Sequence, residues 1–151
     1  MKRIISLLLA VMTVLALTAC GGKTTTVDAQ SLAKALAEKT AFESELSAVS
    51  KEELGYYFQL PAKCDAAAYM SSGSTAEEIF VIECYDGASA AALRTSMQDF
   101  LDSQKTEMER YLPAEVDRIN GAIFETYGTC VVLCVTSDTD TARSVIKEYV
   151  K

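Results

Sequence analysis

A long amphipathic helix is predicted over about residues 89–111, and it constrains the fold more than any other stretch of the chain. Asp86-Gly87 precedes this helix, and Pro113 cannot continue it. Its apolar residues recur at steps of three and four, so they lie on one face that a sheet or another helix must cover. These positions are Leu93, Met97, Phe100, Leu101, Met108, Tyr111 and Leu112, with Gln104 in a gap between them.

Strand-like segments precede the helix. Residues 64–70 and 78–85 are apolar and are separated by Ser71-Ser72-Gly73-Ser74, a composition typical of the turn of an antiparallel hairpin. Residues 41–49 alternate between apolar and polar side chains, which predicts an additional strand with its glutamates facing outward.

A second hairpin and a final helix follow the long helix. Residues 122–127 and 129–136 flank Gly128 and predict two further strands. Helices are predicted at both ends of the domain, over residues 28–39 with Asp28 as N-cap and over residues 137–149. Shorter helical turns are expected at 51–60 and 113–119.

This order of elements predicts a single α+β domain over residues 28–151. Its antiparallel sheet would be built from the two hairpins plus the additional strand. The long central helix and the N- and C-terminal helices are expected to cover one face of that sheet.

The N-terminus has the layout of an export signal. Met1-Lys2-Arg3 is a short positive region, and the apolar segment 4–19 is too short to cross a bilayer comfortably. It ends in Leu17-Thr18-Ala19-Cys20, which resembles the bacterial lipobox. The resemblance implies that residues 1–19 are a signal peptide and that Cys20 receives a diacylglyceryl group. We therefore expect a lipid-anchored protein at the extracytoplasmic face of the cell membrane.

The polar stretch after Cys20 predicts a linker, so residues 20–27 comprise the lipidated cysteine and its tether. Seven residues, 21–27, reach at most about 25 Å when extended. The folded domain is therefore expected to stay close to the bilayer.

Charge limits the partners of the domain. The chain has a net charge of −7, and removal of Lys2 and Arg3 with the signal makes it −9. Nucleic acid is excluded as a partner, because phosphate binding requires clustered basic side chains. The remaining partners are the membrane, contacted through Cys20, and an envelope protein or a small ligand.

The chain contains no histidine, which excludes serine–histidine and cysteine–histidine nucleophile pairs and histidine-based zinc sites. We expect no cofactor and no metal. The pairs Glu52-Glu53 and Glu77-Glu78 are interpreted as solvated surface. Asp138 begins a short acidic stretch that suggests calcium ligands, but helix capping accounts for it better.

Four cysteines remain after Cys20, and their pairing stays open. Cys130 and Cys134 lie four apart in one predicted strand, so they cannot bond to each other. Cys84 could pair with either of them if their strands are neighbours. The alternative is that these three cysteines and Cys64 are small apolar core residues.

Several motifs resemble those of a known family. They are Glu77-Glu78-Ile79-Phe80, Ser103-Gln104-Lys105, Tyr111-Leu112-Pro113, and residues 127–133 with Ser137-Asp138. They are similar to the lipoproteins of Gram-positive anaerobes classed as domain of unknown function 4358. The likeness covers about residues 41–150 and implies a lipoprotein, but it implies no activity.

Two functions are considered for the domain. The first is a non-catalytic binding or interaction domain, and the exposed part of Tyr56-Tyr57-Phe58 is one candidate contact. The second is a small cell-envelope hydrolase that uses carboxylates, with Glu77, Glu78 or Glu125 as candidates.

Overall fold

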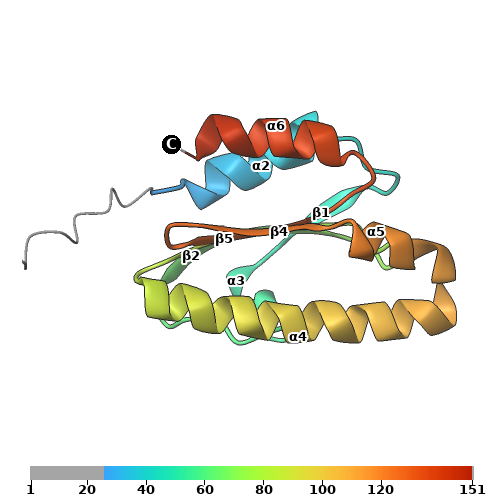
Figure 1. Ribbon diagram of the computed structural model, residues 1–151, viewed down its shortest axis with the longest axis horizontal. Helices are drawn as coiled ribbons and strands as arrows, with labels where there is room; N and C mark the ends of the chain where they lie inside the picture. Colours follow the sequence, from blue (N-terminus) through green and yellow to red (C-terminus); the bar gives the residue numbers. More distant parts are fainter. Residues whose placement is uncertain (1–25, 151) are drawn as a thin grey trace, which may run out of the picture.

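The computed structural model describes residues 26–150 (Figure 1). The predicted signal peptide, residues 1–19, lies outside the described residues, as do Cys20 and all of the predicted linker except residues 26 and 27. Within residues 26–150, no helix is long and apolar enough to cross a membrane.

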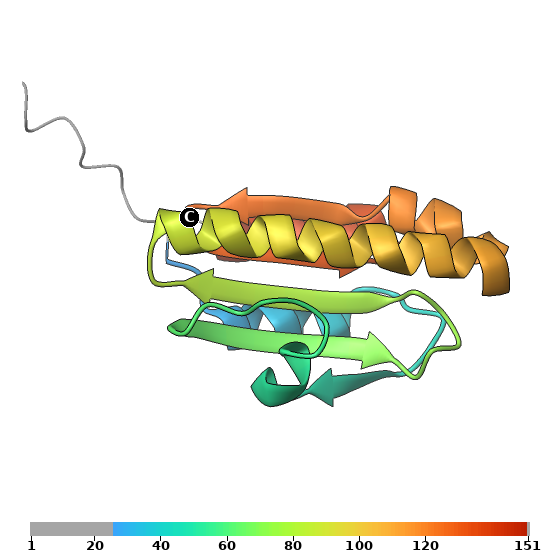
Figure 2. The same ribbon diagram turned by 90° about the horizontal axis from the view of Figure 1, so that it is seen from below.

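The described chain is built around a five-stranded sheet with the strand order β1-β2-β3-β5-β4. All neighbouring strands are antiparallel (Figure 2). Gly73 and Gly128 lie in the turns of the two predicted hairpins and adopt positive φ angles of 93° and 61°, which favour glycine. The strands are β1 (Leu46–Val49), β2 (Cys64–Ser71), β3 (Glu78–Cys84), β4 (Ile123–Tyr127) and β5 (Cys130–Val135).

Helices cover both faces of the sheet. Helices α2 (Ala29–Lys39) and α6 (Thr139–Tyr149) pack on one face, and α4 (Gly87–Tyr111) packs on the other (Figure 1). The α+β class, the antiparallel sheet and the terminal helices on one face are confirmed. The long helix does not share that face, because every residue of β5 is buried and both sides of the central strands therefore need a cover.

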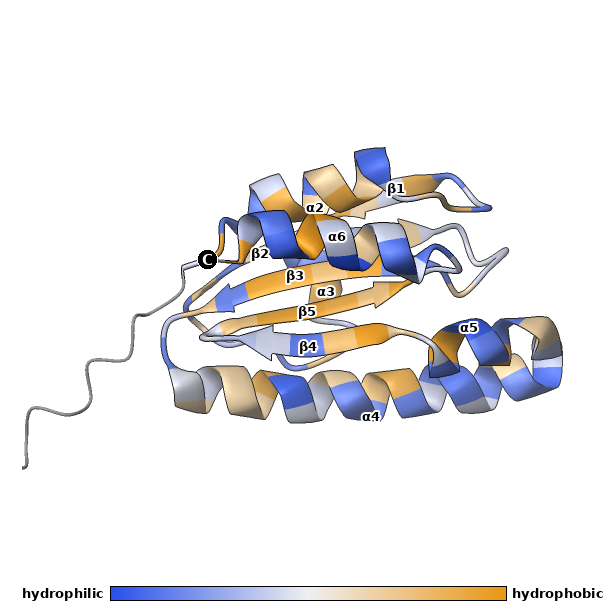
Figure 3. Cartoon of the chain, turned by 45° about the horizontal axis from the view of Figure 1, so that its top comes forward, coloured by the Kyte–Doolittle hydropathy of each residue, from blue (hydrophilic) through white to orange (hydrophobic). Residues whose placement is uncertain are grey.

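Strand alternation divides the core into two layers. On the α2 and α6 side, Ile79 and Val81 of β3 pack with Val132 of β5. On the α4 side, Phe80 and Ile82 pack with Leu93. Figure 3 shows the apolar central strands between helices that carry both hydrophilic and hydrophobic residues. The two faces of β3 and β5 thus pack against different layers of helices.

The additional strand is shorter than predicted. Only Leu46–Val49 pairs with β2, whereas residues 41–45 are not a strand. The amide of Ala41 donates to Asp138, and the amides of Glu43 and Ser44 donate to Glu77. These carboxylates take the N–H groups that a strand would use in its ladder. The remaining short helices are α3 (Lys51–Leu54), η2 (Pro113–Glu115) and α5 (Val116–Asn120).

Candidate functional site

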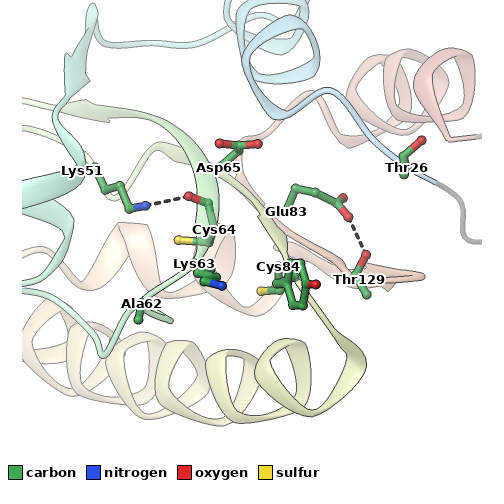
Figure 4. Close-up of a pocket in the computed structure, with 10 residues that line it drawn as sticks. Thr26, Lys51, Ala62, Lys63, Cys64, Asp65, Glu83, Cys84 and Thr129 are labelled. Atoms are coloured by element: carbon green, nitrogen blue, oxygen red, sulfur yellow. Dashed lines mark hydrogen bonds between the residues drawn. The ribbon is translucent and has the colours of Figure 1, made fainter.

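An open pocket of about 600 Å³ lies at the end of the sheet where the described chain begins. Thr26 forms part of its rim, and the pocket floor comes from the start of β2 and the end of β3 (Figure 4). Charged residues of both signs line it, together with two cysteines. They are Lys51, Lys63, Cys64, Asp65, Glu83 and Cys84.

Several polar groups of this pocket already have partners. Lys51 Nζ donates to the carbonyl oxygen of Cys64 at 2.6 Å. Glu83 accepts hydrogen bonds from the Thr129 hydroxyl and, at 3.4 Å, from the Val27 amide. The second contact ties the incoming chain to the sheet, so the pocket lies directly beside the point where the N-terminal segment enters the fold.

A buried carboxylate, Glu77, directly precedes the opposite end of β3 and is 1% exposed. Its oxygens accept hydrogen bonds from the amides of Glu43 and Ser44 at 2.9–3.0 Å and from the Thr75 hydroxyl at 3.1 Å. The Arg118 Nε lies 3.8 Å from Glu77 Oε1. Glu77 therefore fixes the loop before β1 to the β2–β3 turn.

Arg118 links Glu77 to two further acids. Its guanidinium contacts Glu43 at 2.5 Å and also pairs with Glu115. Glu115 in turn accepts a hydrogen bond from the Ala76 amide at 2.8 Å. The Arg118 and Glu115 side chains are only 9% and 11% exposed, whereas that of Glu43 is 64% exposed. The network therefore extends from the buried Glu77 to the surface.

Glu78 points toward α4 and is also 1% exposed. Gln104 Nε2 donates to its Oε2 at 3.2 Å. Burial raises the pKa of Glu78 from 4.5 to about 8, and the Gln104 hydrogen bond opposes that rise. Glu78 is therefore mostly protonated at neutral pH. Its Oε1 and the Oε1 of Gln104 are buried without a partner.

The interpretation of Glu77 and Glu78 as solvated surface is thus wrong. Residues 41–45 and α5 cover Glu77, and α4 covers Glu78. One sequence signal pointed to this burial: Gln104 interrupts the apolar face of the long helix, where a polar partner is required. By contrast, the other predicted acidic pair, Glu52-Glu53, is exposed.

A family model, Domain of unknown function (DUF4358), matches residues 38–136. The chain belongs to this family. No curated protein and no solved structure matches the chain. The matched part of this DUF4358 chain contains all five strands and α4, whereas α6 and most of α2 lie outside it.

The three acids considered for hydrolysis in this DUF4358 domain have separate partners. Glu77 and Glu78 border a pocket of about 400 Å³, but each is 1% exposed. Glu125 accepts hydrogen bonds from the Tyr127 hydroxyl and from Arg143, and these lower its pKa. A general base must reach a proton of its substrate. The buried and hydrogen-bonded carboxylate of Glu77 is unsuited to that role.

The structure also shows where residues predicted for other roles lie. Asp138 is the N-cap of α6 and accepts from the Thr141 amide, which confirms capping. Of the aromatic run, Phe58 is buried, and Tyr56 is 87% exposed. Within residues 26–150, no three histidine, cysteine, aspartate or glutamate side chains gather in a way that could hold a metal ion.

Proposed function

We propose that this DUF4358 chain is a lipoprotein at the extracytoplasmic face of the cell membrane and that its domain acts by binding rather than by catalysis. The observation that carries the proposal is the segment Leu17-Thr18-Ala19-Cys20 at the end of an apolar run that follows Lys2 and Arg3. A diacylglyceryl group on Cys20 brings two acyl chains, which is sufficient for stable attachment.

The start of the fold supports a close attachment. Val27 is 4% exposed, and its amide donates to Glu83, so the folded domain begins there. Cys20 and Val27 are seven residues apart, which limits their separation to about 25 Å. The pocket beside Thr26 would then face the bilayer or a protein lying close to it.

The chemistry of the domain supports binding. The Glu77 carboxylate accepts hydrogen bonds from three donors, and Glu78 is buried beneath α4. The open pocket near Thr26 presents Lys63 and Asp65 instead of a set of catalytic groups. Charges of both signs suit a polar segment of an envelope protein or a small ligand, and a net charge of −9 after removal of the signal does not suit nucleic acid.

Metabolic labelling with an alkyne analogue of palmitate tests the anchor. The unmodified chain is expected to be labelled and to fractionate with membranes. Cys20→Ala should abolish the label and release or mislocalise the protein, whereas the matched variant Cys64→Ala should retain the label. Labelling of Cys20→Ala would overturn the anchor assignment.

Crosslinking in intact cells tests the binding role. Recovery of a defined partner from the wild-type chain, lost on charge reversal at Lys63 and Asp65, is the expected result. If crosslinking recovers no partner and no small molecule binds in a ligand screen, the binding role is contradicted. The anchor assignment would not be affected by that result.

A further inference from the structure

Two cysteines lie directly opposite each other at one end of the sheet. The antiparallel register of β2 and β3 pairs Cys64 with Cys84. Both belong to the layer on the α4 side, so their side chains lie on the same face of the sheet. Figure 4 shows the two residues on neighbouring strands at the floor of the open pocket.

The backbone hydrogen bonds identify the type of this pair. The Cys84 amide donates to the carbonyl oxygen of Thr129 at 3.0 Å, so it points toward β5 and away from β2. Cys64 and Cys84 therefore form a non-hydrogen-bonded pair, in which opposite Cα atoms are about 4.5 Å apart and side chains are close. That separation lies within the range of about 4.4–6.8 Å that a disulfide spans.

The other pairings that the sequence left open are excluded by the fold. Cys130 and Cys134 pack in the layer on the α2 and α6 side. In the register of β3 and β5, Cys130 lies opposite Glu83, and Cys134 lies opposite Ile79. Their side chains are on the other face of the sheet from Cys84, so backbone rearrangement would be needed to join them.

The surroundings of Cys64 allow reaction. Strand β1 pairs with β2 only over Ala68–Ser71, so the first residues of β2 lie at an unpaired edge. Cys64 is half-buried, and its thiol donates to the Pro61 carbonyl oxygen at 3.4 Å. Cys84 is 4% exposed. A small oxidant entering the open pocket would therefore meet Cys64 first.

We propose that Cys64 and Cys84 are a disulfide-forming pair that closes the β2–β3 hairpin when the chain meets a small disulfide oxidant. The Cys64 thiolate attacks one sulfur of the oxidant, forms a mixed disulfide and releases one thiolate. The Cys84 thiolate then attacks the Cys64 sulfur and releases the second thiolate. The two cysteines lose two protons and two electrons, and the oxidant is reduced to two thiols.

The proposed extracytoplasmic location would place this pair where disulfides persist. The chemistry itself does not depend on that location, because it can be measured on the purified chain. A failure of the lipid-anchor experiment and a failure of this one are therefore distinguishable.

The experiment uses the full chain in detergent with Cys20→Ser, so that only the four cysteines of the domain react. The protein is incubated with oxidised glutathione at mildly alkaline pH. Free thiols are then blocked with N-ethylmaleimide under denaturing conditions, and the protein is analysed by intact mass and peptide mapping. We expect two N-ethylmaleimide adducts instead of the four of the reduced chain, a protein mass that is two hydrogens lower once those adducts are subtracted, and one linked peptide pair that contains Cys64 and Cys84.

Matched variants make the result specific. Cys134→Ala removes a buried cysteine of the opposite face and should still form the bond. Cys84→Ala should stop at the mixed disulfide with glutathione on Cys64. Four blocked thiols after oxidation, a stable glutathione adduct on Cys64 of the chain with Cys84 intact, or a link to Cys130 or Cys134 would each overturn the proposal.

Discussion

Gln104 of α4 donates a hydrogen bond of 3.2 Å to the carboxyl group of Glu78 on β3, and each of the two side chains retains one buried oxygen without a partner. A proton on Glu78 Oε1 would supply the missing donor, because a carboxylic acid and a primary amide can exchange two hydrogen bonds. Charge on Glu78 would instead be buried beneath the long helix without a cation. The pair is thus suited to the neutral acid.

The protonation of Glu78 predicts a loss of stability as the pH rises. Below pH 4.5 the group is neutral in both the folded and the unfolded chain. Between 4.5 and about 8 the unfolded chain releases the proton while the folded chain keeps it. The free energy of unfolding should therefore fall by up to about 1.4 kcal/mol per pH unit in this window from this group. Above about pH 8 its contribution should be constant.

Glu78→Gln removes this titration and keeps a donor and an acceptor for Gln104. The variant should be more stable than the wild type near the upper end of the window, and the difference should shrink toward acid pH. The free energy of unfolding of both proteins is measured by urea unfolding, followed by circular dichroism, between pH 4.5 and about 8. The exposed change Glu52→Gln is the control. If the free energy of unfolding depended on pH in the same way in the wild type and in Glu78→Gln, this result would contradict a buried neutral Glu78.

Glu77→Ala should be strongly destabilising for a different reason. The change leaves the amides of Glu43 and Ser44 and the hydroxyl of Thr75 without their acceptor, and it removes a carboxylate beside the buried Arg118. Breaking a buried ionic network by removing one member costs about 3–5 kcal/mol. Urea unfolding should show a loss of that order, whereas Glu52→Ala should be nearly neutral. A small loss for Glu77→Ala would show that the network contributes little.

Asp138 links the segment after α2 to the start of α6, and it predicts a loss of stability in acid. One of its oxygens accepts from the Ala41 amide at 3.1 Å, and the other accepts from the Thr141 amide at 3.4 Å. The hydrogen bond from Ala41 is the main reason that its pKa is lowered from 3.8. The stability contributed by this lowered pKa is present above pH 3.8 and is lost as the pH falls through the folded-state value.

Asp138→Asn offers one acceptor oxygen in place of two. Asp138→Asn should have a lower thermal unfolding midpoint than the wild type at neutral pH. The difference between the two midpoints should become smaller below pH 3.8. Asp140→Asn, an exposed change in the same helical turn, is the matched control. Equal midpoints for wild type and Asp138→Asn at neutral pH would show that the link to Ala41 is dispensable.

Phe58 and Tyr56 provide a matched pair of aromatic truncations. Phe58 is 5% exposed and contacts the rings of Phe80 and Phe100 edge-on, with centroids 5.4 and 5.8 Å away. Phe58→Ala should cost about 3–5 kcal/mol of unfolding free energy, because it leaves a cavity between β3 and α4. Tyr56→Ala should change stability by less than about 0.5 kcal/mol. Similar losses for both variants in urea unfolding would contradict this packing.

Local patterns in the sequence predicted most of the elements. The three- and four-residue spacing of apolar side chains identified α4 within two residues at its start. Turn residues around Gly73 and Gly128 identified both hairpins. Residues 41–45 were predicted wrongly as strand, because their alternation matched a strand while their amides bind the distant side chains of Glu77 and Asp138.

The sequence by itself determined the α+β class, the hairpins and the helix that separates them, because these depend on the periodicity of neighbouring residues. Only the tertiary structure decided that α4 lies opposite α2 and α6, that Glu77 and Glu78 are buried, and that Cys64 lies opposite Cys84. Strands that are apolar on both faces do not specify which helix covers which face. The surroundings of an acid or a thiol depend on register and packing between segments that are far apart in the chain.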